Sequence, residues 1–244
     1  MIRKIIYNKK ANFLNNNILK RYKRNVNYVF NWMRKLKLKN PTILDVGACI
    51  GMYSICYSKI YKNSTIYSYE PVKKNYKELK KNILLNNLKN IYINNIGLSD
   101  KKKNIKIGIP DKKIHLRYSK NINDGLFSIF SNKKKYLVKL ITLDSFIKEK
   151  NIKKIDFIKI DVEGAEYQVL KGAKKTIKKF KPIIQLEYND LTKKLGKKNI
   201  SFFINFAKKN KYRIFYLTKN YKIKRNIDLG KDFFSDLIFI KNNQ

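Results

Sequence analysis

The stretch TILDVGACIGMYS, residues 42–54, is the part around which we expect the chain to be built. A β-branched apolar run leads to Asp45, then Gly47 and Gly51 follow, and the residues after Gly51 can continue as a helix. Glycine lets the chain reverse tightly and lets backbone amides approach a ligand, and a new helix presents free N–H groups and the positive end of its dipole. The stretch therefore predicts a strand, a glycine turn and a helix that together bind an anionic or zwitterionic small molecule.

Glu70 closes a second apolar run, STIYSYE, at residues 64–70. Nucleotide-binding α/β folds place an acid about 20 residues after the glycine turn, where it binds two ribose hydroxyls. The glycine spacing differs from the dinucleotide motif GxGxxG, because the third glycine is missing and Asp45 precedes the turn over which a pyrophosphate would lie. A cofactor with a ribose and an amino group fits better, and S-adenosylmethionine has both.

Residues 1–40 are typical of a basic N-terminal arm followed by a short amphipathic helix, and residues 41–244 of one α/β domain. Strand and helix patterns alternate, which predicts a mostly parallel seven-stranded sheet with right-handed crossovers and an antiparallel strand near the end. We expect helices at 52–61, 71–86, 164–178 and 201–209, and strands at 42–45, 64–70, 91–98, 156–162, 182–187, 212–217 and 236–241.

The pattern changes between residues 100 and 143, where short alternating runs replace the helices. These runs, IKIGIP, IHLRY, LFSIF and YLVKLITL, predict a β-hairpin insertion after the third strand. We expect the insertion to roof the cofactor cleft, where the choice of acceptor would be made.

The chain of 244 residues has 57 Lys and Arg against 17 Asp and Glu, a formal net charge of +40. This excess suits a phosphate-rich partner. The basic residues are spread along the chain, however, as when lysine accumulates at solvated positions, so nucleic acid is not the favoured partner.

Two cysteines are too few for a disulfide framework, and the sequence has no apolar run of membrane-spanning length and no secretory pattern. We expect a cytoplasmic protein.

Carboxylates are scarce in this chain, so their positions are informative. Asp45, Glu70, Asp161 and Glu187 fall at or near the carboxyl ends of expected parallel strands, the edge at which open α/β sheets bind ligands. Each alone could instead cap a helix or pair with a lysine, but four together favour a ligand site. Lys159, inside an otherwise apolar strand, needs a buried partner, for which Asp45 and Glu187 on neighbouring strands are the candidates.

On the basis of these residues and the motifs around them, the chain resembles the FkbM family of S-adenosylmethionine-dependent methyltransferases. The likeness covers roughly residues 40–190, through ILDVGACIGMYS, YEPVKKNYKELKKNI, IGLSD, LITLDSFI, DFIKIDVEGAEYQVLKGA and KPIIQLEYN, and DLIFIK near the end also fits. IDVEGAE followed by LKGA, after a DVGAxxG start and an EP pair, is far more specific than a lone glycine motif. One departure is clear, because Cys49 stands where the family commonly has Asn.

The resemblance implies a Rossmann-like class I methyltransferase fold and, usually, O-methyl transfer to small molecules or glycans. It implies a cofactor site at the ends of the first three strands: Asp45, Gly47, Ala48 and Gly51 for the methionine end, Glu70 for the ribose, and Ser99 and Asp100 near the adenine. It also implies that Asp161, with Glu163 and Glu166 beyond it, faces the methyl group and the acceptor.

A base near the acceptor hydroxyl would remove its proton as the oxygen attacks. Asp161 is the first candidate, then Glu163, then His115, which is the sole histidine and lies in the insertion. A metal held by Asp161 and Glu163 is an alternative with weak support from their spacing, and we expect none. The expected reaction is O-methylation of a sugar, glycan or other small-molecule hydroxyl; the alternatives are an RNA methyltransferase and a non-catalytic fold that binds nucleic acid or a partner.

Overall fold

The computed structural model describes residues 31–109, 127–131, 133–197, 199–217, 223–224 and 235–241. His115, the expected strand IHLRY and most of the basic N-terminal arm lie outside these residues. Residues 31–35 are helical, and Trp32 and Met33 are buried in the core, as the helical spacing predicts. Within the part of the chain that the structure describes, every helix is too short or too polar to cross a lipid bilayer.

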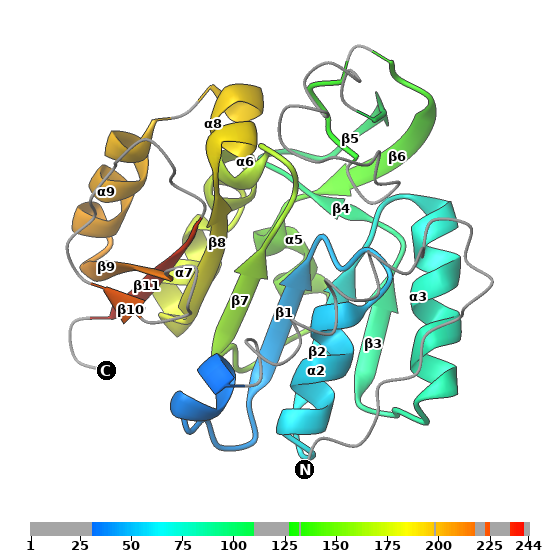
Figure 1. Ribbon diagram of the computed structural model, residues 1–244, viewed down its shortest axis with the longest axis horizontal. Coiled ribbons are helices and arrows are strands. Elements are labelled where there is room, and N and C mark those ends of the chain that lie inside the picture. Colours follow the sequence, from blue (N-terminus) through cyan, green and yellow to red (C-terminus); the bar gives the residue numbers. More distant parts are fainter. Residues whose placement is uncertain are drawn as a thin grey trace.

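A main sheet of eight strands forms the centre of the molecule, in the order β10-β9-β11-β8-β7-β1-β2-β3 (Figure 1). The five strands from β8 to β3 are parallel, and β11 is antiparallel to both of its neighbours, β8 and β9. This confirms the mostly parallel α/β sheet with an antiparallel strand near the end, and the two-residue β10 adds an eighth strand to the expected seven. The bounds are β1 Thr42–Val46, β2 Thr65–Tyr69, β3 Ile91–Asn94, β7 Phe157–Ile160, β8 Ile183–Tyr188, β9 Tyr212–Leu217, β10 Ile223–Lys224 and β11 Ser235–Lys241.

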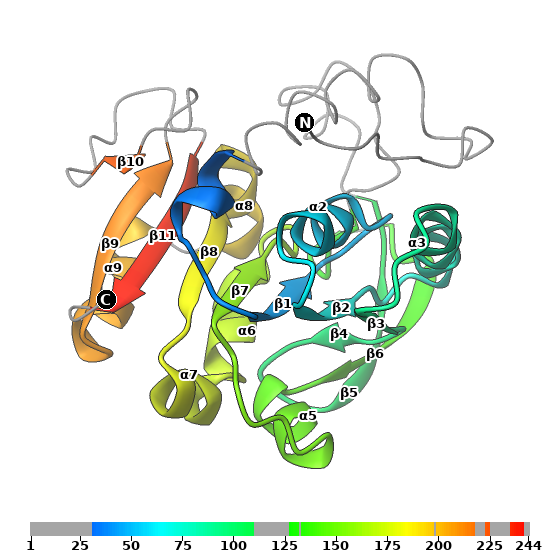
Figure 2. The same cartoon turned by 90° about the horizontal axis from the view of Figure 1, so that it is seen from below.

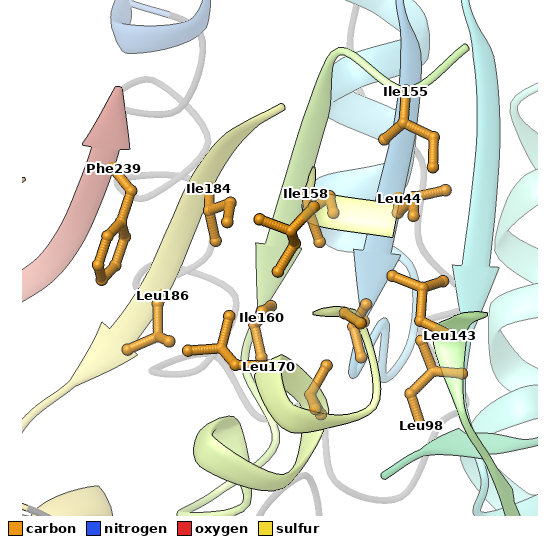
Figure 3. Close-up of a cluster of buried hydrophobic side chains, with 14 of the residues drawn as sticks. Leu44, Leu98, Leu143, Ile155, Ile158, Ile160, Leu170, Ile184, Leu186 and Phe239 are labelled. Atoms are coloured by element: carbon orange, nitrogen blue, oxygen red, sulfur yellow. The ribbon is translucent and has the colours of Figure 1, made fainter. Parts of the chain in front are cut away.

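Helices cover both faces of this sheet. Figure 2 shows α2 and α3 on one side and α5 and α7 on the other. On the α5 side, apolar side chains at alternate strand positions form the larger core cluster, which extends from Phe239 of β11 across to Leu44 of β1 (Figure 3). The helices are α2 Met52–Ile60, α3 Lys73–Leu85, α5 Leu143–Glu149, α6 Glu166–Lys171, α7 Lys174–Phe180, α8 Asp190–Gly196 and α9 Ile200–Lys209.

The expected third strand, residues 91–98, is in fact two strands in two sheets. β3 pairs with β2 in the main sheet, whereas β4 (Gly97–Leu98) pairs with β6 in a small sheet of order β4-β6-β5. The chain turns between them at Asn95, whose side-chain amide donates to the carbonyl oxygens of Glu70 and Pro71 at 2.9 and 3.1 Å. The single-strand prediction was wrong because this bond to a distant turn interrupts a run that looks continuous in sequence.

The insertion is a β-hairpin in part. β5 (Lys103–Ile107) and β6 (Tyr136–Ile141) are antiparallel, as two of the four alternating runs predict. The described part of the run LFSIF, residues 127–130, is not a strand: it makes one bridge, between Gly108 and Ser128, and then a turn. The end of YLVKLITL is also helical, because Thr142 stops β6 and caps α5 by accepting the N–H of Ser145.

The expected helix at 164–178 is two helices, α6 and α7, which separate at Gly172. A Cβ at Gly172 would lie 2.0 Å from the carbonyl oxygen of Ser99, so glycine is needed where the chain passes β4. α7 begins anew because the N–H groups of Lys175 and Thr176 donate to the side chain of Asp144 at 3.0 and 2.8 Å. α5 and α8 were not among the expected helices.

Candidate active site

The face of the main sheet that packs against α2 changes character along its strands. Near the amino ends of the parallel strands its side chains are apolar and buried, as at Ile43, Ile66, Phe157 and Ile183. Two residues further along each strand, on the same face, the side chains are polar. Strand register places Asp45, Ser68, Lys159 and Gln185 side by side, and Glu187 pairs with Asp236 two residues further along. With Glu70 and Asp161 at the ends of β2 and β7, they form the set that we call the polar strip: Asp45, Ser68, Glu70, Lys159, Asp161, Gln185, Glu187 and Asp236.

Asp45 is the most deeply buried acid of the polar strip, with 0% exposure. Its Oδ2 accepts the hydroxyl of Ser54 from α2, and the Ser54 hydroxyl lies 2.7 Å from that of Ser68. Its Oδ1 has no hydrogen-bond partner among the described residues. Burial raises the pKa of Asp45, although the charge of Lys159 opposes this effect. One buried acceptor oxygen therefore remains open to a donor.

The glycine turn is fastened to the end of β2. The N–H groups of Gly47 and Ala48 both donate to the carbonyl of Tyr69 at 3.0 Å. The carboxylate of Glu70 then accepts the N–H of Cys49 at 2.9 Å and the N–H of Val72 at 2.8 Å. Burial raises the pKa of Glu70 to about 8, while these two N–H groups act in the opposite direction. The turn thus fixes the position of the acid that the sequence assigns to a ribose.

The same turn lies directly against the end of β7. The N–H of Asp161 donates to the carbonyl of Val46 at 3.0 Å. Gly47 has φ of 87°, and a Cβ there would lie 1.8 Å from the carbonyl oxygen of Asp161. Glycine is needed for both reasons. The structure therefore brings the candidate cofactor turn next to the first candidate base.

Lys159 has a different partner from the two that the sequence suggested. Its Nζ lies 2.6 Å from Oδ2 of Asp161, directly after the same strand, and 4.0 Å from the ring centroid of Tyr53. Burial by itself would lower the pKa of Lys159, but the charges of Asp161, Asp45 and Asp236 outweigh it and raise the pKa. The expectation of an ion pair with Asp45 or Glu187 was wrong because Asp161 lies two residues further along the same face, within direct reach.

Three members of the polar strip were missed in the sequence: Ser68, Gln185 and Asp236. The side-chain amide of Gln185 donates to Oδ2 of Asp236 on the antiparallel strand β11. Burial raises the pKa of Asp236, and Lys159 opposes it. Gln185 is a polar residue inside the apolar run PIIQLE, which is the same kind of signal that marked Lys159. Asp236 could be placed in the site only by knowing that β11 runs antiparallel. This direction puts the first residues of β11 at the carboxyl edge of the parallel strands.

The buried carboxylate of Glu166 holds the turn after β7 through hydrogen bonds to its backbone. Its Oε1 accepts the N–H groups of Val162 and Gly164, each at 3.1 Å, and burial raises its pKa to about 7. Glu163 sits at the tip of this turn with φ of 53°. The hydroxyl of Ser128 in the insertion donates to the carbonyl of Glu163 at 2.7 Å. Glu166 therefore supports the turn, and the insertion contacts it.

Three carboxylates meet at this edge of the sheet. One oxygen from each of Asp161, Glu163 and Glu187 lies within 4.8 Å of the other two. Burial, followed by the negative charges of Asp161 and Glu163, raises the pKa of Glu187 well above its usual value. The sequence identified all three as acids near strand ends but did not show that they converge.

Ser99 and Asp100 belong to a neighbouring part of the fold. The N–H of Ser99 donates to the carbonyl of Ile141 at 2.8 Å, and its hydroxyl lies 3.2 Å from Oδ1 of Asp100. Asp100 lies 3.6 Å from Lys171 of α6 and 3.8 Å from Lys103. These contacts join β4 to α6 and β6, so a role near an adenine stays a prediction, as does the role of His115 outside the described residues.

Comparison with known proteins agrees with this architecture. A family model described as the methyltransferase FkbM domain matches residues 45–214. The chain is 29% identical over 156 residues to methyltransferase sdnD of Sordaria araneosa, covering 54% of this chain and 60% of that protein. It is 25% identical over 142 residues to methyltransferase 1 of Beauveria bassiana (strain ARSEF 2860), covering 53% and 57%. The chain thus spans less than two thirds of the length of these curated relatives.

Solved structures share the fold. Methyltransferase FkbM from Methylobacillus flagellatus KT matches with a TM-score of 0.55 at 17% identity, covering 87% of this chain and 47% of that one. A putative rRNA methylase from Clostridium thermocellum matches with a TM-score of 0.50 at 10% identity, covering 89% and 92%. At these identities the likeness supports the Rossmann-like fold alone. The family model, which spans well over half of the chain, shows that this protein belongs to the FkbM methyltransferase family.

Proposed function

We propose that the chain is an S-adenosylmethionine-dependent methyltransferase that acts on a hydroxyl oxygen of a sugar, glycan or other small molecule. The observation that carries this proposal is the carboxylate of Glu70, held at the end of β2 by the N–H groups of Cys49 and Val72. An acid in this place suits the two ribose hydroxyls of a nucleoside. These N–H groups occupy one lone pair on each oxygen, and the Asn75 side chain also hydrogen-bonds to Glu70, so the ionised carboxylate keeps acceptor capacity for a ribose hydroxyl.

The residues beside Glu70 suit the amino-acid end of this cofactor. The buried, unpartnered Oδ1 of Asp45 can accept a hydrogen bond from an ammonium group, directly or through a water molecule. Gly47, Ala48 and Gly51 allow the backbone of the turn to approach a ligand closely. On the adenine side, Ser99 and Asp100 complete the proposed set.

The bound cofactor would supply an electrophilic methyl group on a sulfonium sulfur. The task of the chain is then to align the acceptor oxygen and to exclude water. We assign removal of the hydroxyl proton to Asp161 or Glu163, with His115 of the insertion as the third candidate. The carboxylates of the polar strip favour binding of a sulfonium more than they favour the rate, because its positive charge is lost in the transition state.

RNA is the second candidate acceptor, and the formal net charge of +40 favours it. An RNA acceptor bound through lysine contacts to phosphates would be released steeply by salt. A small neutral acceptor would not be, because no counterions are displaced when it binds.

Transfer of labelled methyl groups from S-adenosylmethionine into a host cell extract tests this function. The labelled products are separated into glycan, lipid, RNA and small-metabolite fractions. We expect label in the glycan or small-metabolite fraction with the unaltered chain and with Glu149→Gln, a change at an exposed surface acid, and none with Glu70→Ala. Label in the RNA fraction would show that the acceptor is RNA and not a glycan or small metabolite. Equal labelling with Glu70→Ala would contradict the assignment of the site.

A further inference from the structure

The structure carries an inference about the three converging acids Asp161, Glu163 and Glu187. We propose that they form a binding site for one divalent metal ion of the magnesium, manganese or calcium type. This departs from the expectation of no metal that the sequence alone gave. The site itself does not depend on methyl transfer, but its use in holding an acceptor rests on the proposed function.

The geometry of the three oxygens suits a shared ion. Magnesium and calcium bind oxygen ligands at about 2.0–2.6 Å, so two oxygens on one ion lie at most about 4–5 Å apart. The three carboxylates each offer an oxygen within 4.8 Å of the other two. They come from separate positions, the end of β7, the turn after it, and β8, which allows them to approach an ion from different directions.

A second observation points to a cationic ligand. The Oε2 of Glu187 is buried and has no hydrogen-bond partner among the described residues. The same is true of Oε1 of Gln185, a residue with only 3% exposure. The amide of Gln185 is directed toward this end of the sheet, because its nitrogen donates to Asp236, the register partner of Glu187. Buried acceptors without partners are costly, and a cation with its bound water would satisfy them.

The local charges agree with a double charge on the ion. Lys159 is the cation held against this group, at 2.6 Å from Oδ2 of Asp161. Three carboxylates this close together repel one another when they are ionised, and a divalent ion between them would remove that repulsion. All the ligands are oxygens. Such a set suits hard cations such as magnesium, manganese and calcium better than it suits zinc.

Such an ion would lie next to the glycine turn, because the Asp161 carbonyl packs directly against Gly47. In the proposed reaction it would hold the acceptor hydroxyl and lower the pKa of that hydroxyl, as bound cations do for water. The carboxylate oxygens on the ion would then be ligands, and a remaining oxygen of Glu163 would still accept the hydroxyl proton. The substrate class that fits best is a vicinal diol or similar oxygen-rich group able to bind the ion through two oxygens.

Titration of the full chain with manganese chloride alone tests the site, with no cofactor or acceptor present. After removal of metals with a chelator, free manganese is followed by its electron paramagnetic resonance signal near neutral pH. We expect one saturable equivalent, displaced by magnesium. Glu163→Gln and Glu187→Gln should each weaken it by about tenfold or more. Glu149→Gln, at an acid whose side chain is 68% exposed on α5, should leave it unchanged.

The outcomes separate this proposal from the proposed function. Saturable manganese binding lost in Glu163→Gln supports the metal site even if Glu187→Gln fails to fold, and it does so whether or not the chain binds S-adenosylmethionine. Absence of saturable binding by the folded chain, or equal binding by both Gln variants, overturns the metal site and leaves cofactor binding untouched. Binding of methylammonium in place of manganese would also overturn it and would indicate an amine acceptor.

Discussion

The carboxylate of Glu70 accepts the backbone N–H of Cys49 at 2.9 Å, across 21 residues of sequence. This bond ties the glycine turn after β1 to the end of β2. It links the strand-end acid to the turn that the proposed cofactor would contact. A substitution at either residue should therefore alter the position of the other.

Glu70 should make the stability of the fold depend on pH. Burial raises its pKa from 4.5 to about 8, so between these values the folded chain keeps a proton that the unfolded chain has lost. The free energy of unfolding must therefore fall as pH rises through this window and level off above it. We expect Glu70→Gln to remove this contribution. The free energy of unfolding of the variant should therefore rise relative to that of the unaltered chain as pH rises. Urea unfolding at several pH values measures the difference, and a difference independent of pH would contradict this account.

Cys49 occupies a backbone conformation that does not suit it. Its φ of 50° lies in the left-handed region, which Asn tolerates better than other side chains with a Cβ. We expect Cys49→Asn to stabilise the chain by about 0.5–1 kcal/mol and Cys49→Val to destabilise it by about 1–2 kcal/mol, because β-branched residues are least tolerated there. Thermal melting of both variants tests the order, which equal melting temperatures would refute.

Gly47 and Gly51 should differ in their tolerance of a methyl group. Both have positive φ, but a Cβ at Gly47 meets the backbone oxygen of Asp161 at 1.8 Å, whereas one at Gly51 meets the end of the Leu79 side chain at 2.5 Å. A side chain can move where a backbone cannot. We expect Gly47→Ala to cost at least about 2 kcal/mol more than Gly51→Ala in unfolding free energy. A larger loss for Gly51→Ala would be evidence against the packing of the turn on β7.

Lys159 and Asp161 should be strongly coupled. Removing one partner of a buried ion pair leaves an uncompensated charge, which costs about 3–5 kcal/mol when both groups are buried and less here, because the Asp161 side chain is 27% exposed. We expect Lys159→Met to destabilise by about 2–4 kcal/mol, and the double variant with Asp161→Asn to lose less than the sum of the two single changes. A double-mutant cycle in urea measures this, and strictly additive losses would show that the pair is not coupled.

Much of the fold could be predicted because its signals are local. The run before Asp45, the following glycines and the alternating helix and strand periods define the parallel sheet, and the acids at strand ends indicate its binding edge. The start of β11 at Ser235 and the end of β9 at Leu217 each lie within one residue of the expected bounds. Periodicity is reliable here because each strand buries one or both faces in a core.

The rest depended on contacts between distant segments. The break between β3 and β4 comes from bonds of Asn95 to carbonyls 24 and 25 residues earlier, and the break at Gly172 from its approach to Ser99. In the candidate site, the ion pair of Lys159 and the convergence of Glu187 with Glu163 depend on strand register. No single-sequence pattern encodes such register, although Gln185 inside an apolar run was a usable signal.

Calorimetric titration of the full chain with S-adenosylmethionine tests the central claim most directly. The account predicts binding of one cofactor molecule. Above about pH 8, where Glu70 is ionised, Glu70→Gln should weaken this binding by about tenfold or more, because a charge-assisted pair of ribose hydrogen bonds is lost, and Glu149→Gln should leave it unchanged. A folded chain that shows no binding, or Glu70→Gln binding as tightly as the unaltered chain, would contradict it.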